Sequence, residues 1–219
     1  MCLHFTTFIQ KKNVYFKPFY KKTVKKSKSI RSVKEQYSDE YIMELLGKEA
    51  THERGFRLMM QAFQEPLYRH VRRLLYDHDD ANDVIQNTFI KVFRNIERFE
   101  GKSKLFTWLY RIATNEAITF LNNRNRKETE TIDDPNNVYL ANQLRADTFF
   151  DGDAIQVRLQ QAIATLPDKQ RAVFNLRYYD EMPYEEMSTV LDTSVGALKA
   201  SYHHAAKKVE AFFKGIEID

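Results

Sequence analysis

The sequence predicts an all-α protein in which two helical domains are joined by a flexible acidic linker. Three observations predict this fold class. Apolar residues recur at steps of three and four along several segments, and no segment shows the alternation of a half-buried strand. The chain of 219 residues contains only 6 Gly and 5 Pro, which disfavours turn-rich architectures. Residues 127–152 are acidic, weakly periodic and too few to form a domain of their own.

The N-terminal residues 1–37 mix lysines with aromatic residues and show no helical or strand period. Residues 1–38 contain ten Lys or Arg and one Glu. We interpret residues 1–37 as a basic, disordered extension, or as upstream sequence outside the native product. The alternative is a basic arm that contacts nucleic acid without sequence preference. Lysines follow the first ten apolar residues rather than precede them, which is the wrong order for a secretory signal, and we expect a cytoplasmic protein.

The first predicted domain covers residues 38–126 and contains five helical segments, the last of which is the long helix from about Leu105. Ser38 precedes an acidic first turn, as a helix N-cap does. A helix is expected over about 53–64, and a fresh helix is expected from Pro66 to about Tyr76. The segment YDHDDAND is expected to be a turn. An apolar stripe then follows at helical spacing: Ile85, Phe89, Val92, Ile96 and Phe99.

A long helix is expected from about Leu105 to Asn123, after the loop FEGKSK. The linker at 127–152 is expected to hold at most one short helix near 138–144. The second domain, residues 153–219, begins with a helix that Pro167 ends, followed by a helix over 170–179. A short helix over 184–191 and a long last helix follow, and the last one has an apolar stripe at Leu198, Tyr202, Ala205, Val209 and Phe212.

Signals of enzyme chemistry are weak, so we expect no catalytic residues, no metal site and no cofactor. The GKS at 101–103 lacks the earlier glycine of a phosphate-binding loop, because Ile96 occupies that position. His203 and His204 point about 100° apart on a helix and cannot chelate one ion together. Cys2 is the single cysteine, which excludes a disulfide framework. The acidic pairs at 79–80 and 185–186 are expected to be solvated surface.

The strongest functional signal is the segment YEEMSTVLDTSVGALKASYHHAAKKV, residues 184–209. A short helix, a tight turn and a second amphipathic helix are typical of a helix-turn-helix. Ser194 is placed to cap the second helix. The outer face of that helix carries Lys199, Ala200, His203 and Lys207, which suits entry into a DNA major groove. The alternative is a helical hairpin with a solvated basic face.

The long helix of the first domain presents a second candidate surface. Six residues fall within about 80° of one another on a helical wheel: Trp108, Arg111, Asn115, Thr119, Asn122 and Arg126. Amides and guanidinium groups can hydrogen-bond to bases, and an indole can stack on an unpaired base. The preceding loop, 100–104, is the best candidate for capturing such a base. Trp108 is alternatively part of the hydrophobic core at the edge of the bundle.

A third signal is an outward apolar residue on the helix that contains DVIQNTFIKVFR. Ile90 lies about 140° from Ile85 and shares the outer face with Gln86, Asn87 and Arg94. An apolar residue ringed by polar ones is a candidate docking patch for another protein. Single exposed apolar residues are also common on surfaces without a function.

These segments together resemble a bacterial RNA polymerase sigma factor of the extracytoplasmic-function group of the sigma-70 family. DVIQNTFIKVFRNIERF is similar to region 2.2 of the family, which binds core polymerase. FTWLYRIATNEAITFLNNRNR is similar to regions 2.3 and 2.4, which melt and read the minus-ten element. LPDKQRAVFNLRYYDEMPYEEMSTVLDTSVGALKASYHHAAKKV is similar to region 4, whose helix-turn-helix reads the minus-thirty-five element.

The resemblance implies three sets of functional residues. The set for core polymerase is Asp83, Gln86, Asn87, Ile90 and Arg94. The set for minus-ten DNA is Lys102, Lys104, Trp108, Arg111, Asn115, Asn122 and Arg126. The set for minus-thirty-five DNA is Ser194, Lys199, Ala200, His203, His204 and Lys207.

The resemblance implies that core RNA polymerase and promoter DNA are the partners, with an anti-sigma protein, membrane-linked or not, as regulator. It implies no small-molecule substrate and no direct membrane insertion. Asn122 and Asn123, and also Ser201 and His204, stand where the family often has basic residues, which bears on the promoter sequence rather than on the class. Two rival functions remain from the residues alone. They are a free-standing helix-turn-helix regulator and a helical adaptor without a DNA role.

Overall fold

The computed structural model describes residues 38–129 and 154–214, and every regular element in these two ranges is a helix. The N-terminal range contains α3 (Asp39–Leu46), α4 (His52–Leu75), α5 (His78–Asn95) and α6 (Leu105–Thr129). Two short 3-10 helices, η2 (Glu49–Thr51) and η3 (Ile96–Arg98), precede α4 and follow α5. The C-terminal range contains α8 (Ala154–Ala164), α9 (Asp168–Tyr178), α10 (Tyr184–Leu191) and α11 (Val195–Lys214). The all-α fold class is confirmed.

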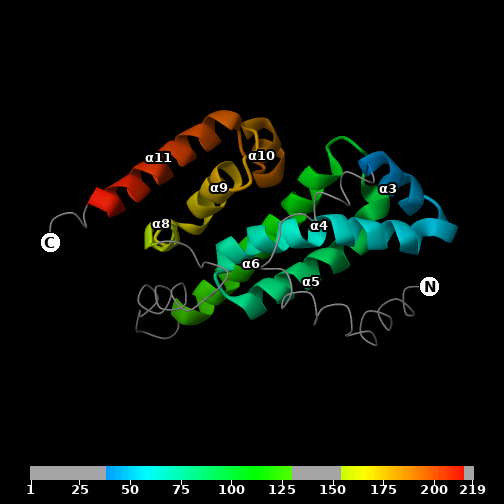
Figure 1. Ribbon diagram of the computed structural model, residues 1–219, viewed down its shortest axis with the longest axis horizontal. Helices are drawn as coiled ribbons and strands as arrows, with labels where there is room; N and C mark the ends of the chain where they lie inside the picture. The colour runs from blue at the N-terminus through cyan, green and yellow to red at the C-terminus, as the bar shows by residue number, and fades with distance from the viewer. Residues whose placement is uncertain (1–37, 130–153, 215–219) are drawn as a thin grey trace.

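Helices α4, α5 and α6 lie side by side, and α9 and α10 lie against α4 and α6 (Figure 1). The basic N-terminal segment lies outside the described residues, as do most of the predicted linker and its short helix near 138–144. Helix α6 continues to Thr129, three residues into the predicted linker.

Helix α3 begins where the sequence predicts. The Ser38 side chain accepts a hydrogen bond from the Tyr41 N–H at 3.2 Å, and Asp39 and Glu40 occupy the first turn. Helix α3 packs closely on α4 at Gly55. A Cβ atom at Gly55 would stand 2.9 Å from the backbone nitrogen of Leu46, so glycine permits this close approach.

The prediction of a helix break at Pro66 is wrong. Helix α4 runs without interruption through Pro66 from His52 to Leu75. Proline in a helix interior removes one backbone hydrogen bond and costs roughly 3 kcal/mol. Phe63 and Leu67, on either side of Pro66, are fully buried, and this burial on both sides offsets the loss.

The predicted turn YDHDDAND is shorter than expected. Helix α4 ends at Leu75, its C-cap Tyr76 has a left-handed φ of 62°, and α5 already begins at His78. Between them, the Asp77 carboxylate accepts hydrogen bonds from the N–H groups of Asp79 and Asp80, at 2.8 and 2.9 Å. One capping side chain therefore starts the helix within a segment that reads as a polar loop.

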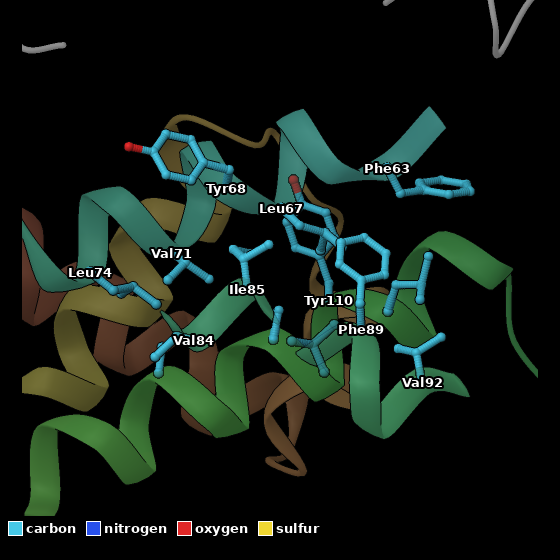
Figure 2. Close-up of a cluster of buried hydrophobic side chains, with 14 of the residues drawn as sticks. Phe63, Leu67, Tyr68, Val71, Leu74, Val84, Ile85, Phe89, Val92 and Tyr110 are labelled. Atoms are coloured by element: carbon cyan, nitrogen blue, oxygen red, sulfur yellow. The ribbon is translucent and has the colours of Figure 1, made fainter. Parts of the chain in front are cut away.

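The main hydrophobic core lies between α4, α5 and α6. Figure 2 shows the apolar side chains of α4 and α5 facing each other beside Tyr110 of α6. The predicted stripe of α5 is buried at Ile85, Phe89, Val92 and Ile96, and Phe99 is half-buried. On α6, Leu109, Ala113 and Ala117 of the predicted face are buried.

The two predicted domains share this core. The cluster of buried side chains that contains Phe63 and Leu109 continues into α9, α10 and α11 through seven residues: Ala172, Val173, Leu176, Met182, Met187, Val190 and Leu198. A second, smaller cluster joins α8, α9 and α11 around Ile163, Phe174 and Ala205. The C-terminal helices therefore pack on the N-terminal bundle as well as on one another.

Candidate nucleic-acid interface

Helices α10 and α11 form the predicted helix-turn-helix. Helix α10 ends at Leu191, and its C-cap Asp192, with a left-handed φ of 50°, turns the chain sharply. The Ser194 side chain then accepts a hydrogen bond from the Ala197 N–H at 3.3 Å, which confirms the predicted cap of α11. Met187, Val190 and Leu198 fill the space between the two helices and the rest of the protein.

The outer face of α11 points away from the hydrophobic core and is exposed. All six residues predicted for minus-thirty-five DNA are exposed: Ser194, Lys199, Ala200, His203, His204 and Lys207. The Lys199 ammonium lies 5.7 Å from the centre of the Tyr184 ring, which orients this side chain beside the turn. The rings of His203 and His204 are 6.0 Å apart and extend the same polar surface. The fold thus brings these residues together on one accessible helix face.

The stripe predicted on α6 is also accessible along its length. Arg111, Asn115, Asn122 and Arg126 are exposed. Trp108 is half-buried, and its ring lies 5.2 Å from that of Phe99 with the planes at 49°. Trp108 is thus packed at the edge of the core and still reaches the surface. Both interpretations of Trp108, base stacking and core packing, agree with this position.

The loop before α6 carries the remaining cations predicted for minus-ten DNA. Gly101 adopts a left-handed φ of 69° and turns the chain between η3 and α6. Lys102 is exposed and pairs with Glu100. Lys104 is exposed and pairs with Glu186 of α10, with Nζ 2.7 Å from Oε1. Glu186 raises the pKa of the Lys104 ammonium, through this hydrogen bond and through its negative charge.

The prediction that both Glu185 and Glu186 are solvated surface is wrong for Glu186. Its side chain is 23% exposed, and its second oxygen accepts a hydrogen bond from Thr107 at 3.3 Å. Glu185, its neighbour, is exposed. The rotation of α10 against α6 separates the two carboxylates.

The same prediction for Asp79 and Asp80 is wrong for Asp80. Asp80 lies 3.4 Å from the Arg124 guanidinium, and 31% of its side chain is exposed. Burial raises the pKa of Asp80, the nearby Asp77 adds to the rise, and Arg124 opposes it. Asp80 therefore helps to hold the start of α5 against α6.

The docking patch predicted on α5 lies on an accessible face. Asp83, Gln86, Asn87 and Arg94 are exposed, and Ile90 is half-buried among them. The buried stripe of Ile85, Phe89 and Val92 sets the rotation of α5 that leaves Ile90 on the outer face, and Lys91 pairs with Glu116 of α6. The patch lies on a different helix from the two candidate DNA surfaces.

A polar cluster that the sequence patterns above did not indicate lies where the end of α9 meets α4. Asp180 Oδ2 lies 2.9 Å from His70 Nδ1, and Asp180 Oδ1 accepts a hydrogen bond from Arg73 at 3.1 Å. His70 is fully buried, and its Nε2 lies 2.9 Å from the Thr114 hydroxyl on α6. The signal in the sequence was a histidine and two arginines on an otherwise apolar stretch of α4.

Two specific features are absent from the described ranges, a membrane-spanning helix and a group of metal-binding side chains. Neither 38–129 nor 154–214 contains a helix with the length and apolarity needed to span a bilayer. No group of three or more His, Cys, Asp or Glu side chains in these ranges is arranged to hold a metal ion.

Two family models match the chain in the order and places of the segments described above. Sigma-70 region 2 matches residues 59–127, which includes α5 and nearly all of α6. Sigma-70 region 4 matches residues 156–209, which includes the helix-turn-helix. The two matches together cover more than half of the chain.

Several curated relatives are RNA polymerase sigma factors, and the matches cover most of the length of each relative. The chain is 28% identical over 194 residues to the ECF RNA polymerase sigma-E factor of Escherichia coli, covering 80% of this chain and 94% of that protein. It is 27% identical over 183 residues to the sigma-E factor of Haemophilus influenzae, covering 80% and 95%. The RNA polymerase sigma-H factor of Pseudomonas aeruginosa is 29% identical over 173 residues, covering 72% and 85%.

Solved structures support the same fold. The sigma factor RpoE, in complex with the anti-sigma factor NepR from Bartonella quintana, matches with a TM-score of 0.58 at 20% identity. That match covers 73% of this chain and 96% of RpoE. CnrH, in complex with the cytosolic domain of CnrY, matches with a TM-score of 0.58 at 18% identity, covering 81% and 97%. The chain therefore belongs to the extracytoplasmic-function group of the sigma-70 family, whose members direct RNA polymerase to promoters.

Proposed function

We propose that the three accessible faces divide the work of promoter recognition among α5, α6 and α11. The face of α5 with Asp83, Gln86, Asn87, Ile90 and Arg94 binds core polymerase. The loop before α6 and the stripe along α6 capture the minus-ten element. The outer face of α11 reads the minus-thirty-five element. The observation that carries this proposal is that one chain presents two exposed polar and cationic helix faces and a separate apolar-centred patch.

The proposed domain limits follow from this division. Residues 38–126 act as region 2, residues 153–219 act as region 4, residues 127–152 link them, and residues 1–37 are an extension of the first domain. The exposed stripe of α6 and the capped α11 each support one of the two modules.

The chain needs no covalent chemistry for this function. Extruding a base from duplex DNA costs a few kcal/mol. Base stacking on aromatic side chains returns about 1–3 kcal/mol per base. Each module makes few phosphate contacts, and joint anchoring on one polymerase raises the effective concentration of the second module after the first has bound. We therefore infer a non-enzymatic initiation factor that acts in the cytoplasm at a restricted set of promoters.

An anti-sigma protein is the regulator that the family implies. RpoE of Bartonella quintana was solved with the anti-sigma factor NepR, and CnrH was solved with the cytosolic domain of CnrY. Both are structural relatives of this chain, which supports a regulator of the same kind here.

Run-off transcription tests the proposal. The purified chain is added to core RNA polymerase on genomic fragments, and specific start sites are expected only when both are present. The rival free-standing regulator predicts a different outcome. It would bind operator fragments without polymerase and would give no specific start sites when core polymerase is added.

A further inference from the structure

A half-buried aromatic residue lies between the candidate DNA-reading helix α11 and the helices that carry it. Tyr184 is the first residue of α10, and its N-cap Pro183 has φ −60° and ψ 146°. The Tyr184 ring packs against the main hydrophobic core. Because proline fixes φ, the backbone at the start of α10 has little freedom. The ring is therefore a fixed part of the helix-turn-helix.

The Tyr184 ring contacts a cation from each of the two neighbouring helices. The Arg177 guanidinium of α9 lies 5.2 Å from the ring centre, and it donates a hydrogen bond to the Met182 carbonyl at 3.2 Å. The Lys199 ammonium of α11 lies 5.7 Å from the ring centre. Both distances are within the ~6 Å at which the face of a ring attracts a cation. Arg177 is already tied to the loop between α9 and α10, so Lys199 is the cation whose position the ring determines.

The backbone of α11 beside Lys199 is anchored to the C-terminal helices. Leu198 and Ala205 are buried, which sets the rotation of the helix. The Tyr202 ring stacks on Phe174 of α9, with ring centres 5.5 Å apart and planes at 20°. With the backbone held in this way, the rotamer of Lys199 alone decides where its ammonium lies. The contact with the ring of α10 favours rotamers on one side of the reading face.

Lys199 is suited to contact DNA directly. It is exposed, and within residues 38–129 and 154–214 no carboxylate forms an ion pair with it. It lies near the N-terminus of α11 (Val195–Lys214), and the N-terminal residues of a recognition helix contact base edges. An ammonium can donate hydrogen bonds to the acceptor atoms of a base edge in the major groove. A lysine loses rotamer freedom when it binds, and a ring that already restricts its rotamers lowers that cost.

We propose that Tyr184 is a positioning residue that directs the Lys199 ammonium to one base edge of the minus-thirty-five element, an inference that rests on the proposed function. Tyr184 acts through Lys199 and makes no contact with DNA itself. Without the ring, the ammonium samples neighbouring acceptors as well, and the preference for one base at that position decreases. Lys207 belongs to the same reading face and has no ring contact among the described residues, so it is the matched comparison.

Run-off transcription on a set of promoter variants tests the inference. The minus-thirty-five element of a promoter that the chain uses is varied one base at a time, with core polymerase present. The position at which Lys199→Ala loses base preference marks the contact of Lys199. Tyr184→Leu is expected to lower the preference at that same position by about two- to fivefold, whereas Tyr184→Phe keeps the ring and the preference. Lys207→Ala should reduce the product from all sequences alike.

The charge distribution of the ring separates positioning from packing. Pentafluorophenylalanine at position 184 keeps an aromatic ring of similar shape, and its fluorines reverse the negative face that attracts a cation. It is expected to lower the base preference as Tyr184→Leu does, although it retains the packing of Tyr184→Phe. Tyr184→Leu combined with Lys199→Ala should show no greater loss than Lys199→Ala alone, because the ring acts through the lysine.

Three outcomes would overturn the inference. They are an unchanged base preference with the fluorinated ring, an equal loss at all positions of the element in Tyr184→Leu, and a further loss when Tyr184→Leu is added to Lys199→Ala. Should Tyr184→Leu fail to fold, as circular dichroism would reveal, the comparison of the fluorinated ring with Tyr184→Phe decides alone.

A measurement on the free chain separates this inference from the proposed function. The ring current of Tyr184 should shift the NMR signals of the Lys199 side-chain methylenes, and Tyr184→Leu should abolish the shift. If the wild-type chain gives no specific start sites, the proposed function fails, and a shift that is present still supports the hold of Tyr184 on Lys199. If the wild-type chain initiates and the shift is absent, the proposed function stands and the inference fails.

Discussion

Asp180 and His70 are 110 residues apart in the sequence, and their side chains meet at 2.9 Å in the fold. The pair joins α9 to α4 across the two halves of the chain. His70 is fully buried, and the Asp180 side chain is 9% exposed. A contact of this kind makes the stability of the protein depend on how the two halves pack.

Asp180→Ala is expected to lower the free energy of unfolding by roughly 2–4 kcal/mol. Removing one partner of a buried charged cluster costs about 3–5 kcal/mol, and the expected loss is smaller because Arg73 is 17% exposed and keeps some contact with water. Urea denaturation checks this value. Glu185→Ala, at an exposed position of α10, is the control and should change the free energy by less than about 0.5 kcal/mol. Equal losses in both variants would show that the Asp180 cluster does not stabilise the fold.

The fold class and the helix-turn-helix could be predicted from short sequence patterns. Helix α10 has the bounds that the sequence predicts, and Ser194 caps α11 as expected. Both features depend on neighbours within four residues. The missed continuity of α4 through Pro66 depends instead on burial against other helices, which a local proline rule does not include.

The contact between the N-terminal and C-terminal halves could not be predicted from local sequence patterns, because it depends on how helices pack. Glu185 and Glu186 are chemically equivalent in the sequence, and only the rotation of α10 against α6 makes one of them a partner of Lys104. No helical period links His70 with Asp180. The accessible faces of α5, α6 and α11 were predictable, because each follows from the apolar stripe on the opposite side of its helix.

Stability is expected to fall between pH 10 and pH 12 partly because of Tyr179. Burial raises the pKa of Tyr179 to about 12, although the contacting Arg73 acts to lower it. The phenol therefore keeps its proton in the folded chain over a range in which the unfolded chain, with an ordinary value near 10, loses it. The free energy of unfolding decreases as pH rises through this range.

Tyr179→Phe tests this pH dependence. The variant loses the hydrogen bond from Gln160, 2.6 Å long, which lowers stability at every pH. The informative quantity is the slope of the free energy of unfolding against pH, which should become less steep between pH 10 and pH 12. Tyr178→Phe removes the more exposed neighbouring phenol and serves as the control. An unchanged slope in Tyr179→Phe would contradict the assignment.

Ile90→Glu is expected to weaken binding to core polymerase about thirty-fold or more. An apolar anchor at the centre of an interface contributes about 2 kcal/mol or more, and a carboxylate there would be desolvated without a partner. The half-exposed position lets the fold tolerate the change. Fluorescence anisotropy of the labelled chain with core polymerase measures the dissociation constant. Lys91→Gln, on the α6-facing side of the same helix, should bind as the wild type does. Normal binding by Ile90→Glu would remove α5 as the docking face.

Trp108→Ala is expected to reduce promoter opening if the indole stacks on an unpaired base. Each stacked base contributes about 1–3 kcal/mol, so the open fraction should fall at least about fivefold. Permanganate reactivity of unpaired thymines measures opening. Phe99→Leu is the matched control, because it disturbs the ring contact of Trp108 at 5.2 Å and keeps the indole. If both variants lose stability and neither loses opening, Trp108 is a core residue only.

Lys207→Ala and Lys208→Ala form a matched pair that tests how α11 meets DNA. The two side chains point about 100° apart on the helix. Lys207 belongs to the predicted reading face, whereas Lys208 donates a hydrogen bond to Gln170 of α9 at 3.1 Å. Each phosphate contact contributes about 0.9 to the slope of log affinity against log salt concentration. The slope for the polymerase complex on a promoter should therefore decrease by about 0.9 in Lys207→Ala and stay near the wild-type value in Lys208→Ala. Equal slopes in the two variants would mean that α11 approaches DNA with a different face.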